Sequence, residues 1–180
     1  MSSKNVSSAD NQQERIENCG WIVGIVDGEG SFLVNIFRSP NTKFGWQIFP
    51  EFNVSQSKKG IDILYALESF FECGHIYEHK MRNKNKRDWD SLFKYCVRSR
   101  KELQERIIPF FQKYPPHSKV KRNDYKIFVR VVKMMSEGKH YNIEGMRQIA
   151  EMTKYMTHRK SFSESSISKF LSSSETIRRA

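Results

Sequence analysis

The sequence predicts an α+β domain in which helices cover one face of a four-stranded antiparallel sheet. Regular segments follow the order α-β-β-α-β-β-α, with further helices after them. The first two strand segments alternate apolar and polar residues, which is typical of strands that bury only one face. The formal net charge of +11 over 180 residues is large for this size. We therefore expect the uncovered sheet face to meet a partner, and a polyanion suits the charge best.

The first helix and the two strands after it define the start of the domain. We expect residues 1–12 to be disordered, because they are polar and rich in Ser and Asn, and a helix to follow from about Gln13 to Asp27. Strand alternation begins at once in residues 31–38 and, after a turn at Pro40-Asn41, resumes in residues 46–55. The shared apolar face of these strands consists of Phe32, Val34, Ile36, Ile48, Phe52 and Val54.

The remaining elements complete one domain over residues 13–157. They are a helix at 59–72, strands at 75–80 and 92–98, and helices at 101–112, 124–136 and 142–156. We expect Asn142 to cap the last helix, since Asn is a favoured N-cap residue. Residues 158–180 form a tail with eight serines between Ser161 and Ser174, which we expect to be flexible.

Charge and cysteine content indicate the kind of partner and the redox environment of the protein. Residues 80–87 hold five cations and no acid, which favours nucleic acid over an anionic membrane because no amphipathic basic helix is evident. The three cysteines are far apart and lack zinc-ligand spacing, so we expect reduced thiols and an intracellular protein. No apolar run reaches membrane-spanning length, and the first residues lack a signal-peptide core, so we expect no membrane partner.

The segment from Trp21 to Phe32 is the most informative in the chain. An apolar run ends in two acids, Asp27 and Glu29, with a glycine on each side of Glu29. Carboxylates at a helix C-terminus oppose the helix dipole, at a cost of roughly 0.3–1 kcal/mol each. A compensating cation is expected there, and a hard divalent metal such as Mg²⁺ or Ca²⁺ prefers carboxylate and carbonyl oxygens.

This segment resembles the signature motif of the LAGLIDADG homing endonucleases, in the form Ile22-Val23-Gly24-Ile25-Val26-Asp27-Gly28-Glu29-Gly30. The resemblance continues in order from about residue 15 to 135. Similar pieces are Phe52-Asn53-Val54-Ser55-Gln56, Phe71-Glu72-Cys73-Gly74-His75-Ile76, the run from Ser99 to Phe111, and Lys119-Val120-Lys121 followed by Asp124-Tyr125. The resemblance implies a saddle-shaped antiparallel sheet facing DNA, with helices on its other face.

The chain carries one copy of the motif, and family members with one motif are similar in working as homodimers. The resemblance therefore implies that the motif helix packs against its own copy, through Trp21, Val23, Gly24, Val26 and Asp27. Glu29 occupies the position of the direct metal ligand, where the family more often has Asp, and the Gly28 carbonyl is a second ligand. Asp27 is expected to have a structural role and to orient backbone near the helix ends.

The resemblance also assigns the remaining catalytic roles. Gln56 would position water near the metal, Lys121 would stabilise phosphate charge or hold the attacking water, and Lys119 is a weaker candidate for the same role. The implied activity is a Mg²⁺-dependent double-strand DNA endonuclease that cuts a long pseudopalindromic site and leaves 3′ overhangs. Ca²⁺ is expected to support binding without cleavage.

The polar sheet face is expected to read bases in the major groove, and the basic loop is expected to contact phosphates. The predicted sheet contacts are Ser31, Leu33, Asn35, Phe37, Arg38, Gln47, Glu51, Asn53, Ser55, Tyr77, His79 and Lys94. The predicted loop contacts are Arg82, Lys84, Lys86 and Arg87.

Two alternatives on the same scaffold stay open at this point. One is an RNA maturase that assists splicing of its own intron, with intron RNA as an additional partner. The other is a DNA-binding regulator without catalysis, which would predict that the acidic residues at the end of the motif are lost. A purely structural dimer is disfavoured by the basic loop and the polar sheet face. The family implies a mitochondrion, a chloroplast or a bacterial cytoplasm as the compartment.

Overall fold

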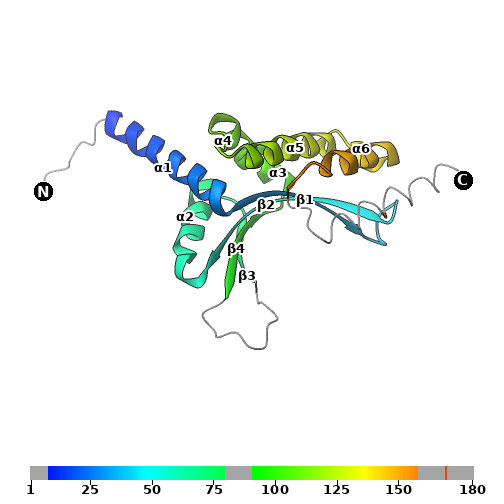
Figure 1. The fold of residues 1–180 in the computed structure, drawn as a ribbon, viewed down its shortest axis with the longest axis horizontal. Coiled ribbons are helices and arrows are strands. Elements are labelled where there is room, and N and C mark those ends of the chain that lie inside the picture. The colour runs from blue at the N-terminus through cyan, green and yellow to red at the C-terminus, as the bar shows by residue number, and fades with distance from the viewer. Residues whose placement is uncertain (1–7, 80–90, 158–168, 170–180) are drawn as a thin grey trace, which may run out of the picture.

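The computed structural model describes residues 8–79, 91–157 and 169 (Figure 1). The predicted phosphate contacts Arg82, Lys84, Lys86 and Arg87, and most of the predicted flexible tail, lie outside the described residues. The strands are β1 (Gly30–Arg38), β2 (Trp46–Ser57), β3 (His75–His79) and β4 (Leu92–Val97). The main helices are α1 (Ser8–Glu29), α2 (Ile61–Phe71), α3 (Arg100–Glu102), α4 (Ile108–Lys113), α5 (Lys119–Ser136) and α6 (Ile143–Thr153).

The four strands form one antiparallel sheet in the order β1-β2-β4-β3, as the α+β prediction requires. Gly30 pairs with Val54 at one end of the β1–β2 ladder, and Arg38 pairs with Trp46 at the other. The sheet curves beneath helices α4, α5 and α6, and its other face is not covered by a described helix (Figure 1). The predicted arrangement of one covered and one uncovered face is therefore confirmed.

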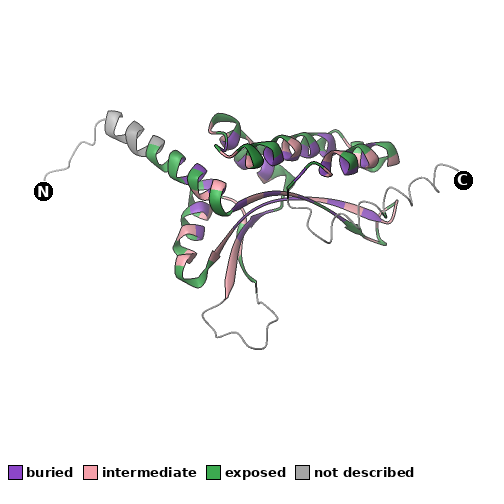
Figure 2. Cartoon of the chain, viewed as in Figure 1, coloured by how far each residue is buried: buried purple, intermediate pink, exposed green. Residues whose placement is uncertain are grey.

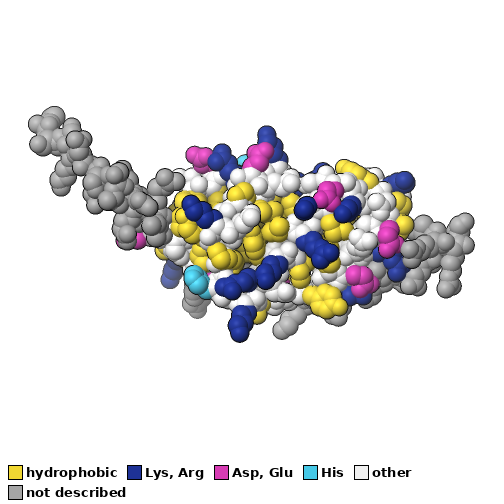
Figure 3. Space-filling model, turned by 90° about the horizontal axis from the view of Figure 1, so that it is seen from above, with side chains coloured by type: hydrophobic (Ala, Val, Ile, Leu, Met, Phe, Trp, Pro, Cys, Tyr) yellow, Lys and Arg dark blue, Asp and Glu magenta, His cyan; other side chains and the backbone are white. Residues whose placement is uncertain are grey.

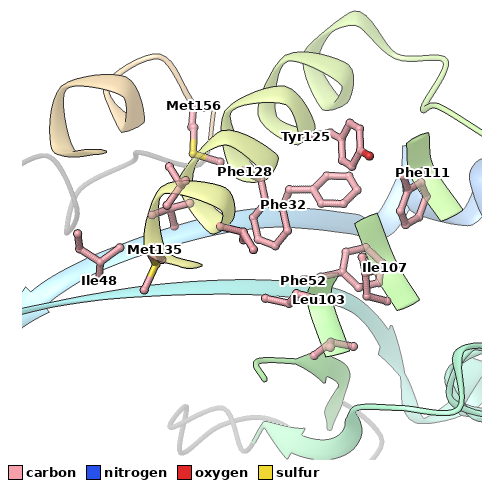
Figure 4. Packing of buried hydrophobic residues seen from close by; sticks show 14 of the residues in the cluster. Phe32, Ile48, Phe52, Leu103, Ile107, Phe111, Tyr125, Phe128, Met135 and Met156 are labelled. Carbon is pink, nitrogen blue, oxygen red and sulfur yellow. The ribbon is translucent and has the colours of Figure 1, made fainter. Parts of the chain in front are cut away.

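The core lies between the covered sheet face and the helices, where buried residues concentrate (Figure 2). Phe32, in β1, is 1% exposed and stands at its centre (Figure 4). Its ring centroid lies 5.2–5.6 Å from four other aromatic rings, which belong to Phe52, Phe111, Tyr125 and Phe128. One aromatic cluster thus packs β1 and β2 against α4 and α5. Tilted and edge-on ring pairs stabilise this packing beyond the effect of the apolar area that they bury.

The largest differences from the sequence prediction are in three helices. α1 begins at Ser8, so residues 8–12 are helical rather than disordered. α5 begins at Lys119 and not at Asp124, because Ser118 is its N-cap and accepts a hydrogen bond from the Lys121 N–H. The helix expected at 101–112 is interrupted by a π-helical turn, Leu103–Ile107, directly before α4, whose Pro109 lacks the N–H of a regular helix.

The faces of α1 also differ from the prediction for a self-pairing helix. Val23 and Val26 are 3% and 0% exposed and belong to the core of their own chain, so they cannot line a surface for a second copy. Trp21 is 43% exposed, and Gly24 is exposed as well. Helical periodicity separates these two stripes, which sequence reasoning had merged into one face. Among the described helices, none is long and apolar enough to cross a membrane.

Candidate active site and nucleic-acid interface

The acidic end of α1 is held against the start of α5. Asp27 Oδ2 accepts a hydrogen bond from the backbone N–H of His117 at 2.8 Å, and Asp27 Oδ1 accepts one from Ser118 at 3.2 Å. The His117 ring also approaches Asp27, with Nδ1 3.4 Å from Oδ2. These contacts confirm the structural role predicted for Asp27. They also leave Glu29, two residues later, exposed where α1 ends and β1 begins.

Lys121 reaches the same point from the first turn of α5. Its ammonium donates a hydrogen bond to the Gly30 carbonyl, the first residue of β1. Burial lowers the pKa of Lys121, while the charges of Asp124, Asp27 and Glu29 oppose that shift. Lys121 therefore lies within electrostatic range of Glu29, although the two are far apart in sequence. Lys119, the first residue of α5, is exposed near the same end of the helix.

Gln56 lies at the same end of the sheet, by strand register. Since Gly30 pairs with Val54, a residue two positions beyond Val54 extends past the start of β1, next to the end of α1. A Cβ atom added to Gly60 would lie only 2.8 Å from Gln56 Oε1, so the glycine makes room for this half-buried amide. Glu29, Lys121 and Gln56, predicted from separate pieces of sequence, thus converge on one corner of the fold.

Glu29 and the Gly28 carbonyl fit the chemistry of a hard divalent cation, since both supply oxygen. One chain alone supplies few such groups, however. Asp27 is occupied by two backbone N–H groups, and no cluster of three or more His, Cys, Asp or Glu side chains that could hold a metal occurs among the described residues. Water and substrate phosphate oxygens, which Mg²⁺ commonly takes as ligands, would complete the coordination of a metal at this corner.

The uncovered sheet face carries most of the predicted base contacts. Strand register aligns Ser31 with Asn53, Leu33 with Glu51, and Phe37 with Gln47, while Lys94 pairs with both Ser55 and Tyr77. Asn35, Phe37, Tyr77 and His79 are exposed, and Ser31, Leu33, Gln47, Ser55 and Lys94 are partly exposed. Arg38 differs, because alternation places it on the same side of β1 as the buried Phe32, Val34 and Ile36, and its guanidinium lies 5.2 Å from the ring centroid of the buried Trp46.

Glu51 and Asn53 are buried, although both were predicted to read bases. They are 8% and 4% exposed, and Asn53 Nδ2 donates to Glu51 Oε1 at 2.6 Å. Arg98 Nε donates to Glu51 Oε2 at 2.6 Å, and its guanidinium carbon lies 4.9 Å from the Tyr77 ring centroid. In the described structure, both carboxylate oxygens of Glu51 are thus engaged within the chain. The observed role of Glu51 is to bind the Arg98 guanidinium, and Asn53 in turn donates a hydrogen bond to Glu51.

Sequence reasoning missed Arg98 as a residue of this face. Its side chain is 44% exposed. The signal was present, because Arg98 continues the alternation of Lys94 and Cys96 one step beyond β4. A guanidinium fixed by a carboxylate on one side and an aromatic ring on another keeps its remaining N–H groups in a defined direction. Such a group suits recognition of a base edge or a phosphate.

Comparison with known proteins identifies the family. The family model described as LAGLIDADG endonuclease matches residues 22–132, which is more than half of the chain. The chain is 32% identical over 135 residues to "Probable intron-encoded endonuclease 2" of Neurospora crassa, covering 74% of this chain. It spans only 28% of that relative's own length. This protein belongs to the LAGLIDADG endonuclease family.

Solved structures of homing endonucleases share the fold, and two serve as examples. The homing endonuclease I-TnaI superposes with a TM-score of 0.74 at 33% sequence identity, covering 87% of this chain and 97% of that chain. The I-LtrWI LAGLIDADG homing endonuclease, solved bound to target DNA, gives a TM-score of 0.74 at 29% identity. The match covers 86% of this chain and 49% of the I-LtrWI chain. The predicted fold and the resemblance on which it rested are thereby confirmed.

Proposed function

We propose that the protein is a site-specific double-strand DNA endonuclease that works as a homodimer with a divalent metal. The observation that carries this proposal is the corner where Glu29 is exposed, Lys121 is held on the Gly30 carbonyl and Asp27 fastens α1 to α5. This corner lies at one end of a sheet whose uncovered face presents polar, aromatic and basic side chains. Cleavage chemistry and DNA recognition would therefore share one side of the molecule.

Dimerisation would use the exposed stripe of α1. Gly20, Gly24 and Gly28 follow one another at intervals of four residues, and a Cβ atom added to any of them would meet nothing within 4 Å. Trp21 borders this stripe, so the revised contact face contains Trp21 and Gly24. It omits Val23 and Val26, which are buried, and Asp27, whose carboxylate is hydrogen-bonded within its own chain. Two-fold pairing along the stripe would bring two Glu29 carboxylates together, and it would match a pseudopalindromic site.

The share of each solved structure that this chain matches agrees with an arrangement of two copies. The fold matches nearly the whole I-TnaI chain but only about half of the I-LtrWI chain, which therefore has room for a second unit of this size. A second copy would also contribute metal ligands, namely its own Glu29 and Gly28 carbonyl.

Each residue at the corner would have a distinct role in phosphodiester hydrolysis. A bound Mg²⁺ would supply Lewis-acid stabilisation of phosphate charge and activation of water. Glu29 and the Gly28 carbonyl would hold that ion, and the Gln56 amide would orient the attacking water. Lys121, with Lys119 as a weaker contributor, would stabilise negative charge on the phosphate. Ca²⁺ would bind the same oxygens and support DNA binding without cleavage.

DNA recognition would combine the uncovered sheet face with the basic loop. Base edges would meet the exposed side chains of β1, β2, β3 and β4, together with Arg98, which is held by Glu51 and Tyr77. The loop cations Arg82, Lys84, Lys86 and Arg87 would contact phosphates and add affinity without sequence preference. Glu51 and Asn53 would act through Arg98 rather than on bases directly.

The test is a cleavage selection. Wild type and Glu29→Gln would each be incubated in Mg²⁺ with a randomised palindrome library, and the cut ends would be sequenced. We expect staggered cuts with 3′ overhangs at one long site for wild type, and none for the variant, which should still bind that site in Ca²⁺. Glu105→Gln, which removes an exposed acid elsewhere, is the matched control and should cut normally. Undiminished cutting by Glu29→Gln would place the chemistry elsewhere.

The oligomeric state needs its own measurement. Light scattering should give twice the 21.3 kDa mass of one chain at micromolar concentration. Replacing Gly24 by a bulky residue, as in Gly24→Leu, should shift the protein to a monomer, whereas Ala66→Leu, at an exposed position of α2, should not. A monomeric wild type that still cuts both strands would contradict the dimer. Sequence-specific DNA binding without any cleavage would instead favour a regulator on this scaffold.

A further inference from the structure

The outward side of α5 is mainly basic, so the expectation from the sequence that the chain has no amphipathic basic helix was wrong. Five exposed cations lie on it, namely Lys119, Arg122, Lys126, Arg130 and Lys133, and we refer to them as the α5 basic stripe. At 3.6 residues per turn they fall within an arc of about 80°, centred roughly opposite the buried Phe128. The acid that α5 contributes, Asp124, is 1% exposed and so does not face outward with them.

The stripe keeps its positive charge in the described structure. No carboxylate among the described residues forms an ion pair with any of the five cations. Glu144 and Glu151 of α6 share a groove with Arg130, but Glu151 is already paired with Lys154 at 2.6 Å. Figure 3, which looks onto the helical layer, shows several Lys and Arg side chains across the middle of this face.

An exposed aromatic residue lies beside the stripe. Tyr155 is 74% exposed, in a turn that follows α6. Asn123 Nδ2, from the first half of α5, donates to the Tyr155 carbonyl at 2.9 Å. The Thr157 N–H also donates to Asp124 Oδ1 at 2.9 Å. The turn is therefore fastened to the first half of α5, although the Tyr155 side chain itself stays largely in solvent.

We propose that the α5 basic stripe and Tyr155 form a second nucleic-acid surface, which binds a single-stranded RNA or DNA segment away from the sheet. A row of cations about 21 Å long, from the rise of 1.5 Å per residue, can follow the phosphates of one strand. An exposed ring beside it can stack on an unpaired base, whereas a fully paired duplex offers no such base. The stripe lies on the helical layer, and the uncovered sheet face lies on the other side (Figure 1).

The test measures binding of labelled single strands to the full chain. The probes are oligouridine and oligodeoxythymidine of about 20 nucleotides, long enough for the site sizes of single-strand binders. The stripe variant is Lys126→Gln/Arg130→Gln. Its matched control, Lys101→Gln/Arg106→Gln, removes two exposed cations from another part of the chain. Tyr155→Ala tests stacking, and the cleavage selection above is repeated with each variant.

Wild type should bind the single strands with a clear salt dependence. Loss of two phosphate contacts should weaken binding by about tenfold to 30-fold at 0.1 M salt and make the slope of log affinity against log salt shallower by about 1.4. Tyr155→Ala should cost about 5- to 150-fold. A preference for oligouridine would identify RNA as the ligand, and equal affinities would identify the shared phosphate and base chemistry. The rate of DNA cleavage by the stripe variant and by Tyr155→Ala should stay within twofold of the wild-type rate.

Several results would overturn the proposal. One is equal weakening by the control variant, since the charge would then act without a defined site. Unchanged binding by Tyr155→Ala would remove the stacking contact on which single-strand preference depends. Parallel loss of cleavage and oligouridine binding in the stripe variant would mean that the stripe serves the duplex. Because binding of single strands does not require cleavage, failure of the proposed endonuclease activity would be seen separately.

Discussion

Replacing Asp27 by Ala should destabilise the fold and displace Lys121 together. The carboxylate accepts hydrogen bonds from the backbone N–H groups of His117 and Ser118, at 2.8 and 3.2 Å, directly before α5. A hydrogen bond to a charged group contributes about 1.5–3 kcal/mol, and the longer of the two contributes less. Favourable placement near a helix N-terminus adds about 0.3–1 kcal/mol. We therefore expect a loss of about 2–4 kcal/mol in the free energy of unfolding.

Thermal unfolding would measure this loss, since 1 kcal/mol shifts the Tm of a chain of this size by about 2–4 °C. The expected decrease is about 4–16 °C for Asp27→Ala. Asp27→Asn keeps one acceptor oxygen and should lose roughly half as much. His117→Ala is the matched control, because it removes an imidazole that is 81% exposed but leaves the backbone N–H in place. Its stability should stay within about 0.5 kcal/mol of wild type.

The same variant tests the link to catalysis. Lys121 lies in the first turn of the helix that Asp27 anchors, so a shift of that turn moves its ammonium away from Gly30. A displacement of about 1 Å at a reacting centre can cost on the order of 100-fold in rate, while binding to the sheet face should change little. Wild-type stability in Asp27→Ala would refute the reasoning, and so would wild-type cleavage by a measurably destabilised variant.

Three further predictions concern the core and the sheet. Phe128→Ala, at a residue that is 0% exposed, should lower the free energy of unfolding by about 3–5 kcal/mol in urea denaturation, and a loss under 1 kcal/mol would contradict the packing described. Arg98→Ala leaves the buried Glu51 carboxylate without its cation and should cost about 2–4 kcal/mol, whereas Arg106→Ala, whose ion pair is exposed, should cost less than about 1 kcal/mol. Burial raises the pKa of Tyr125 from 10.0 to about 12, so the unfolded state releases this proton first and stability should fall as pH rises through that window. In Tyr125→Phe this part of the alkaline decrease should be absent, which urea denaturation at several pH values can check.

Local patterns in the sequence were sufficient for the architecture. Period-two alternation placed Phe32 and Phe52 on one face of β1 and β2, and these two residues pair directly in the sheet. Cap residues also acted as expected, since Asn142 Oδ1 accepts a hydrogen bond from the Gly145 N–H at 2.7 Å. Both features depend only on neighbours in sequence, so they could be predicted without knowing which elements meet.

Contacts between distant segments could not be predicted in the same way. Glu51 looked like a base-reading residue because its position alternates with the apolar face. Its partner Arg98 becomes visible only when β4 pairs with β2 and extends the chain opposite Glu51. The faces of α1 were misjudged for a related reason. Val23 and Val26 pack in the core of their own chain. The pattern of apolar residues alone does not distinguish a helix face that packs in this core from one that contacts a second copy.

The same helix explains why the candidate site is built at a helix-to-strand junction. α1 passes into β1 without a connecting loop, so the position of Glu29 is fixed by the core on one side, through Val26, and by the sheet on the other, through Gly30. Asp27, between them, ties this junction to the helix that carries Lys121. A carboxylate and an ammonium from distant segments are thereby held at one corner by rigid elements. Such placement is what preorganised charge stabilisation requires, because donors that do not move need no reorganisation when the reaction occurs.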